Sequence, residues 1–393
     1  MTACAFTEHF APLPDPRIAR TRLYALCDLL FAALCACLAG ADDYLAMANW
    51  AATHHAWLRE LGVFPNATPS HDTFRYLFLR LDPDHFAAVF RDWTALLPAS
   101  PPANPAAEEA APAAPAHFAV DGKVLCGSRE RTRHPQPLRT VTAWSSEQQL
   151  VLAQVAVAPG ESELDALPQV LGLFDCRGGV VTVDAGGCYT PVLEAVVAAG
   201  ADYVVTVKHN QPHLRTAVEE FLDAVVTGEV AAAGVEQQTT VDWDHGRREE
   251  RRVWWTADVE WLADQVPLSR WPQLRSLGVV ESRRRAQGPD GPETVERRYF
   301  ISSLPGTPGQ GKTFARAVRQ HWGIENKLHW VLDLAFREDA ARVWAGHGAL
   351  NLATLRRLSV NLLRQDRSRR LGVKNRRLRA AWDVDYLAQI LSI

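Results

Sequence analysis

The sequence predicts an α/β fold with a mixed β-sheet, a β-rich insertion and an all-helical N-terminal domain. Three observations carry this prediction: apolar residues at helical spacing before residue 97, short β runs that alternate with helices over 117–208, and charged, alternating β runs over 209–304. The chain has 393 residues, of which 47% are hydrophobic and 22% are charged. This ordinary composition excludes a disordered tail, a collagen-like repeat and a coiled coil.

Residues 1–97 are predicted to form the helical domain. Its helical stretches, which glycine and proline separate, span 22–41, 44–60 and 70–96. The apolar run 26–41 contains Asp28 and is shorter than the roughly 20 residues that span a bilayer, so it predicts a buried helix and no membrane contact. Residues 98–116 are nearly all proline and alanine, a composition that cannot bury a core, and they predict a linker.

After the linker, β runs and helices alternate, which predicts the first part of the core at 117–208. The β runs are 117–120, 140–144, 150–158, 180–183 and 203–207, and the helices are 163–173 and 190–199. The charged region 209–304 is predicted to be a β-rich insertion. Helix returns at 312–334, so 305–340 is assigned to a core helix and 341–393 to a basic helical C-terminal region.

Two of the β runs end in an aspartate, Asp121 and Asp184. An acid that follows a buried strand is held at the edge of the sheet. If the two strands are neighbours at about 4.8 Å, the two carboxylates can share one cation. The alternative for each residue is a turn cap, because Asp often accepts hydrogen bonds from the backbone that follows it.

A third acid, Glu325, lies in the predicted helix. Val318 is seven residues before it and Leu332 seven after, so helical spacing places Glu325 on the apolar stripe. A carboxylate aimed at the core needs a partner, because desolvating an unpaired charge costs several kcal/mol. That partner can be a cation, an arginine or a proton.

His321, Glu325 and His329 follow one another at intervals of four, so a zinc site is a rival interpretation. No further Cys or His motif completes such a site. Three hard carboxylate ligands suit Mg²⁺ or Mn²⁺ better than zinc.

Five sequence blocks around these acids resemble one protein family. They read AVDGKVLCGS around Asp121, VTVDAGGCYT around Asp184, GADYVVTVKHNQPHL at 200–214, RRYFISSL at 297–304 and RQHWGIENKLHWVLDLAFREDAAR at 319–342. In this order they are similar to the bacterial insertion-sequence transposases of the H-repeat-associated type, members of the DDE superfamily. The N-terminal blocks resemble the helical domain that precedes the catalytic core in that family.

The resemblance implies an RNase H-like core and a DNA transposase that cleaves insertion-sequence ends and transfers strands. The catalytic and metal-binding triad of the family maps onto Asp121, Asp184 and Glu325, which would hold two Mg²⁺ or Mn²⁺ ions. The family further implies that the chain binds double-stranded DNA, at element ends and in the target. By the same resemblance, the residues beside the site that serve as DNA contacts or positioning groups are Lys123, Lys208, Asn210, Gln211, Arg319 and Asn326. A homodimer on DNA follows by analogy, since two ends must be brought together. The N-terminal domain is the candidate for end binding.

Two residues depart from the pattern of the family. Cys126 stands where the family commonly has arginine, and Tyr189 lies near the position of a glutamine. These departures affect a nearby phosphate contact and the full activity expected of this copy. Neither departure removes a carboxylate of the triad.

Two further surfaces are predicted to contact DNA. The net charge is only -3, so a basic surface must come from clustering, and residues 340–380 hold eleven Lys or Arg, including Arg356 and Arg357, with Asp366 as the single acid. The alternative is that these residues form a solvated helix face or a flexible tail. Trp254 and Trp255 are adjacent, so a strand would point them to opposite faces and at most one is expected to pack inside. Because related transposases use an aromatic in this insertion to stack on a flipped base, the resemblance implies that one of them contacts DNA.

Two other functions stay open: a metal-dependent nuclease without transposition, and a catalytically inactive, transposase-derived DNA-binding protein. The scattered cysteines and the absence of a basic n-region before an apolar segment predict a cytoplasmic protein. The resemblance implies that it is bacterial and associated with the nucleoid when bound to DNA.

Overall fold

The computed structural model describes residues 3–97, 114–129, 136–244, 247–285 and 292–391. Most of the predicted linker therefore lies outside the described residues. The chain divides into two compact units, one made of 1–102, 122–159 and 325–393, and the other of 103–121 and 160–324. The predicted domain boundaries stay predictions.

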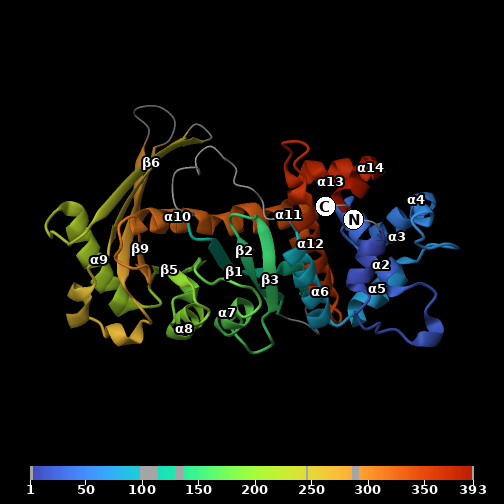
Figure 1. The fold of residues 1–393 in the computed structure, drawn as a ribbon, viewed down its shortest axis with the longest axis horizontal. Coiled ribbons are helices and arrows are strands. Elements are labelled where there is room, and N and C mark those ends of the chain that lie inside the picture. Colours follow the sequence, from blue (N-terminus) through green and yellow to red (C-terminus); the bar gives the residue numbers. More distant parts are fainter. Residues whose placement is uncertain (1–2, 98–113, 130–135, 245–246, 286–291, 392–393) are drawn as a thin grey trace. The chain divides into compact units, whose positions relative to one another are not determined.

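The first unit is built mainly from helices of both ends of the chain (Figure 1). Its helices are α1 (Ala3–Phe10), α2 (Leu26–Leu38), α3 (Tyr44–Thr53), α4 (His55–Glu60), α5 (His71–Arg80), α6 (Pro83–Leu96), α11 (Trp330–Phe336), α12 (Gly348–Gln365), α13 (Val373–Trp382) and α14 (Val384–Leu391). Helix α12 is buried nearly all round and packs against α2, α5 and α6. The predicted N-terminal helices therefore share their core with a C-terminal helix.

A β-hairpin of the first unit packs against the same helix. It consists of β2 (Leu138–Ser145) and β3 (Leu150–Ala156), which pair antiparallel. The buried amide of Asn361 on α12 accepts from the backbone N–H of Val151 at 2.8 Å and donates to its carbonyl at 2.9 Å. One side chain therefore satisfies both backbone groups of a strand residue.

The strands form a nine-stranded mixed sheet in the order β3-β2-β1-β4-β5-β9-β8-β7-β6. Its other strands are β1 (His117–Leu125), β4 (Val180–Val183), β5 (Asp202–Val207), β6 (Glu236–Asp244), β7 (Arg247–Thr256), β8 (Ser276–Arg285) and β9 (Glu293–Ser302). Strands β1, β4 and β5 are parallel, and β9 joins β5 antiparallel. The predicted insertion therefore extends the core sheet, and it contains strand β8 and helix α9 (Pro212–Thr227), which the sequence analysis missed.

Helix α10 (Gln310–Gly323) covers the sheet of the second unit. Figure 1 shows it crossing the middle of the view, with α7 (Glu163–Leu171) and α8 (Thr190–Ala198) lower down. Its Phe314 packs among Val280, Phe300 and Trp255. The close approach depends on Gly278, because a Cβ there would lie 2.3 Å from the Phe314 ring. This arrangement confirms the predicted α/β class with a mixed sheet and N-terminal helices.

Within the described part of the chain, every helix is too short or too polar to cross a membrane.

Candidate active site

The register of two parallel strands sets the positions of two acids. Val120 of β1 pairs with Val183 of β4, and Asp121 and Asp184 each come next. The two acids therefore occupy equivalent positions on adjacent strands, whose backbones are about 4.8 Å apart. Strand β4 ends at Val183, whereas β1 continues to Leu125, so Asp121 lies within a strand and not, as expected, after one.

Asp184 is exposed and begins a short turn. Its Oδ1 accepts a hydrogen bond from the backbone N–H of Gly187 at 3.2 Å, which is the turn cap that the sequence analysis held as an alternative. Among the described residues, Oδ2 has no hydrogen-bond partner. The cap therefore fixes the carboxylate through one of its two oxygens.

The loop that follows Asp184 is held by residues from the end of β5. Asn210 Nδ2 donates to the carbonyl of Ala185 at 2.8 Å, and the buried Gln211 donates from Nε2 to the carbonyl of Cys188 at 2.9 Å. Both amides, predicted as DNA contacts or positioning groups, act on the protein backbone here. Lys208, next to them, is exposed.

Glu325 lies in a π-helical turn. Helix α10 ends at Gly323, and residues Ile324–His329 form a π-helix before α11 begins. The wider turn changes the phase of the helix, so Ile324 and Leu328 are buried while the Glu325 side chain is 56% exposed. The expectation that Glu325 points into the core is therefore wrong. His329 Nδ1 lies 3.4 Å from Glu325 Oε2.

His321, the third member of the zinc alternative, contacts a threonine of the second unit. Its Nδ1 lies 2.9 Å from Thr182 Oγ1, and Nε2 of His117 lies 2.9 Å from the same hydroxyl. Burial, helped by the nearby His321 and Arg316, lowers the pKa of His117 to about 3. His117 is therefore neutral at physiological pH.

Lys123 is buried and forms an ion pair. Its ammonium lies 2.7 Å from Asp333 and 3.6 Å from Asp339, and only 7% of its side chain is exposed. The prediction that Lys123 contacts DNA is corrected, since its charge is already paired inside the first unit. Burial raises the pKa of Asp333, and the hydrogen bond and charge of Lys123 oppose that shift.

Arg356 and Arg357 are also buried. Arg357 Nη1 lies 2.9 Å and Arg356 Nη1 3.9 Å from Glu338 Oε1, and the Arg357 and Glu338 side chains are 0% and 1% exposed. Neither guanidinium is at the surface, so the prediction that they contact DNA is wrong. The roles of Glu338 and Asp333 as ion-pair partners are not evident from the sequence, although both residues lie in the block 319–342.

The rest of the basic C-terminal region is divided between core and surface. Arg364, Arg376 and Arg377 donate to backbone carbonyls. The exposed basic residues are Arg342, Arg367, Arg369, Arg370 and Lys374. The basic surface is therefore smaller than composition predicts.

Both tryptophans of β7 are buried, Trp254 to 8% and Trp255 to 2% exposure. The strand does point them to opposite faces, but both faces are covered there, so the prediction that one of them contacts DNA is wrong. The exposed tryptophan of this region is Trp243 on β6, at 75%.

The remaining predicted residues lie at the surface. Arg319 is 55% exposed and forms an ion pair with Asp242 at 2.8 Å. Asn326 is exposed. Of the two residues that depart from the family pattern, Cys126 is exposed and Tyr189 is half-buried.

Two family models match the chain. One, described as a transposase DDE domain, matches residues 112–362, and the other, DDE_Tnp_1-associated, matches residues 7–94. The first spans Asp121, Asp184 and Glu325, and a DDE domain implies an RNase H-like fold.

Curated bacterial proteins are similar over nearly the whole chain. "H repeat-associated putative transposase YhhI" of Escherichia coli K12 is 30% identical over 98% of this chain and 97% of its own length. "Putative transposase YncI" of Escherichia coli O157:H7 is 29% identical over 100% of this chain and 95% of its own. A solved structure, a piggyBac transposase synaptic complex with hairpin DNA, covers 99% of this chain and 77% of its own at 12% identity and a TM-score of 0.41.

Proposed function

Because the chain belongs to the transposase DDE domain family, we propose that it cleaves insertion-sequence ends and joins them to target DNA with Asp121, Asp184 and Glu325 as its catalytic residues. The observation that carries the proposal is the register, which gives Asp121 and Asp184 equivalent positions on adjacent parallel strands. The exposed side chain of Glu325 in a π-helical turn supports the third assignment, since such turns occur frequently at functional sites.

The donors fit divalent cations of the Mg²⁺ or Mn²⁺ type. Carboxylate oxygens are the ligands these ions prefer, and Asp184 Oδ2 has no hydrogen-bond partner among the described residues. Asp121, Asp184 and Glu325 would hold two ions. When bound, the ions supply activation of a water or a DNA 3′-hydroxyl and stabilisation of the leaving oxygen.

Other residues position the acids and the DNA. Asn210 and Gln211 hold the loop after Asp184, so they keep its carboxylate at one place. The exposed Lys208, Arg319 and Asn326 are proposed to contact DNA phosphates, and a homodimer is proposed to bring two DNA ends together.

The test is cleavage of a DNA duplex that carries the sequence flanking this gene, in Mg²⁺ or Mn²⁺. Wild type is compared with Asp121→Ala, Asp184→Ala and Glu325→Ala. Glu194→Ala is the matched control, because Glu194 is an exposed acid on α8. We expect wild type and the control to cut at the element end, and the three variants to bind the duplex without cutting.

Three outcomes contradict the proposal. Binding without cleavage by wild type would favour an inactive DNA-binding protein. Cleavage that does not require an element end in the DNA would favour a nuclease without transposition. Cleavage that survives loss of Glu325 would remove the third acid from the triad.

A further inference from the structure

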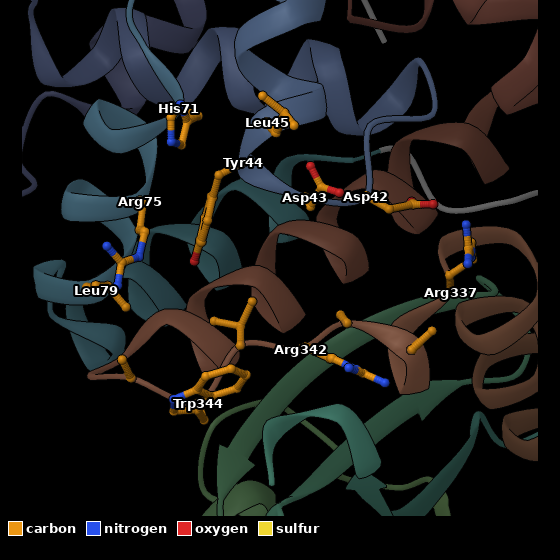
Figure 2. A pocket seen from close by; sticks show the side chains of 14 residues that line it. Asp42, Asp43, Tyr44, Leu45, His71, Arg75, Leu79, Arg337, Arg342 and Trp344 are labelled. Carbon is orange, nitrogen blue, oxygen red and sulfur yellow. The ribbon is translucent and has the colours of Figure 1, made fainter. Parts of the chain in front are cut away.

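The first unit contains a pocket of about 580 Å³, and its lining does not include Asp121, Asp184 or Glu325. Figure 2 shows its lining: His71 and Arg75 come from α5, Arg337 lies on the opposite side, and Arg342 and Trp344 lie along the lower edge in this view. The volume lies within the range of small-molecule sites, about 300 to 1,000 Å³.

The segment that carries Arg342 and Trp344 is fixed to the helices. The backbone N–H of His347 donates to the carbonyl of Leu79 on α5 at 3.1 Å. Gly346 has a φ of +51°, and a Cβ there would lie 2.4 Å from the same carbonyl oxygen. The buried ion pair of Glu338 and Arg357 holds the other end of the segment. The segment that forms this wall is therefore anchored to the helices at both ends.

The charge of the pocket is positive. Its two acids are engaged elsewhere: Asp42 Oδ1 pairs with Arg377 at 2.7 Å, and Asp43 accepts from the backbone N–H of Ala46 at 2.7 Å. Arg337 and Arg342 are exposed, and neither has an ion-pair partner among the residues that the structure describes. Arg75 lies 4.0 Å from Asp72, both about half exposed. The arginines are therefore available to an anion.

The pocket also offers an aromatic surface and an unused hydrogen-bonding group. Trp344 is 40% exposed. Tyr44 is 9% exposed and its hydroxyl has no hydrogen-bond partner in the described part of the chain. A buried hydroxyl without a partner is costly and points to a ligand that supplies one. Leu45, Leu79 and Val343 make the rest of the lining apolar.

We propose that this pocket binds one unpaired nucleotide of single-stranded DNA, with the base against Trp344, its polar edge toward the Tyr44 hydroxyl, and the neighbouring phosphates at Arg75 and Arg342. An aromatic side chain flanked by arginines suits a flat base joined to anionic phosphates. The inference rests on the proposed function in taking DNA as the partner. It does not depend on the metal-binding acids.

The test measures binding of fluorescein-labelled oligothymidylate of about 12 nucleotides in a buffer with EDTA, by fluorescence anisotropy. Trp344→Ala is expected to raise the Kd about tenfold, and Arg342→Ala to raise it severalfold and to lower its salt dependence. Trp344→Phe retains an aromatic ring and is expected to bind nearly as wild type. Trp382→Ala is the control, since Trp382 is 80% exposed on α13 and lies outside the pocket.

A second readout locates the base directly. Oligothymidylate with one central 5-iododeoxyuridine is irradiated with the protein, and the crosslinked peptide is identified by mass spectrometry. We expect the crosslink at Trp344. Crosslinks only at other exposed tryptophans such as Trp243 or Trp382, or unchanged binding by Trp344→Ala, would overturn the proposal.

Two comparisons separate this inference from its alternatives. If thymidine monophosphate displaces the oligonucleotide at micromolar concentration, the pocket is a site for free nucleotides and the proposal fails. Asp184→Asn is expected to bind oligothymidylate as wild type does. Loss of binding by Trp344→Ala therefore supports the pocket even where wild type shows no metal-dependent cleavage, which would count against the proposed function alone.

Discussion

Arg357 and Glu338 form a fully buried ion pair, with Nη1 and Oε1 2.9 Å apart and side chains 0% and 1% exposed. The pair joins the long helix α12 to the segment that follows the π-helical turn. Among the described residues, removing Arg357 would leave the buried Glu338 carboxylate with only the longer contact to Arg356, whose Nη1 lies 3.9 Å from Oε1.

Arg357→Ala is therefore expected to lower the free energy of unfolding by about 3 to 5 kcal/mol. Thermal or urea unfolding measures this loss. Arg370→Ala, at an exposed arginine, is the control and is expected to change stability by less than about 0.5 kcal/mol. If Arg357→Ala instead weakens DNA binding and leaves stability intact, the structural role assigned to Arg357 is wrong.

Substitutions of Trp255 on β7 and Trp243 on β6 should likewise differ in their effect on stability. Trp255→Ala removes a ring that is 2% exposed and packed on α10, so a loss of about 3 to 5 kcal/mol is expected. Trp243→Ala, at 75% exposure, should leave stability within about 0.5 kcal/mol of wild type. Equal melting temperatures for the two variants would count against the packing described for β7.

His117 should make stability depend on pH. Its pKa is about 3 in the folded protein, where burial keeps the ring neutral, and about 6.5 in the unfolded chain. As pH falls below about 6.5, His117 becomes protonated in the unfolded state but stays neutral in the folded state. The free energy of unfolding therefore falls by up to about 1.4 kcal/mol per pH unit until the pH reaches the pKa of His117 in the folded protein.

Urea unfolding at pH 7, 6 and 5 checks this dependence. His117→Asn should lose this part of the slope, whereas His213→Asn, at an exposed histidine of the same unit, should keep it. A wild-type slope that His117→Asn leaves unchanged would mean that other groups produce it.

Substitutions of Asn210 and Lys208 should affect different steps, DNA cleavage for Asn210 and DNA binding for Lys208. Asn210→Ala removes the hydrogen bond to the carbonyl of Ala185, so cleavage is expected to fall about tenfold while DNA affinity stays unchanged. Lys208→Ala should instead weaken DNA binding and reduce the dependence of log K on log salt by about one. The result that argues against this division is a loss of DNA affinity in Asn210→Ala equal to that in Lys208→Ala.

The sequence predicts the α/β class and the position of Asp184 after a buried strand, because an apolar run that ends in an acid is a local signal. Asp121 instead lies within β1, which continues to Leu125. It fails where the answer depends on partners far along the chain. Clustered charge could not reveal that Glu338 neutralises Arg357, and alternation along β7 could not reveal that both of its faces are covered. The exposure of Glu325 follows from a π-helical turn, which regular helical spacing does not predict.

Metal rescue at Asp184 tests most directly the central claim, that these carboxylates hold the catalytic cation. A thiolate is a softer ligand than a carboxylate and binds Mn²⁺ better than Mg²⁺. Asp184→Cys is expected to bind element-end DNA normally, to be inactive in Mg²⁺ and to recover cleavage in Mn²⁺, while Asp184→Asn stays inactive in both. Full cleavage by Asp184→Cys in Mg²⁺, or equal loss in both metals with DNA binding intact, would contradict the account.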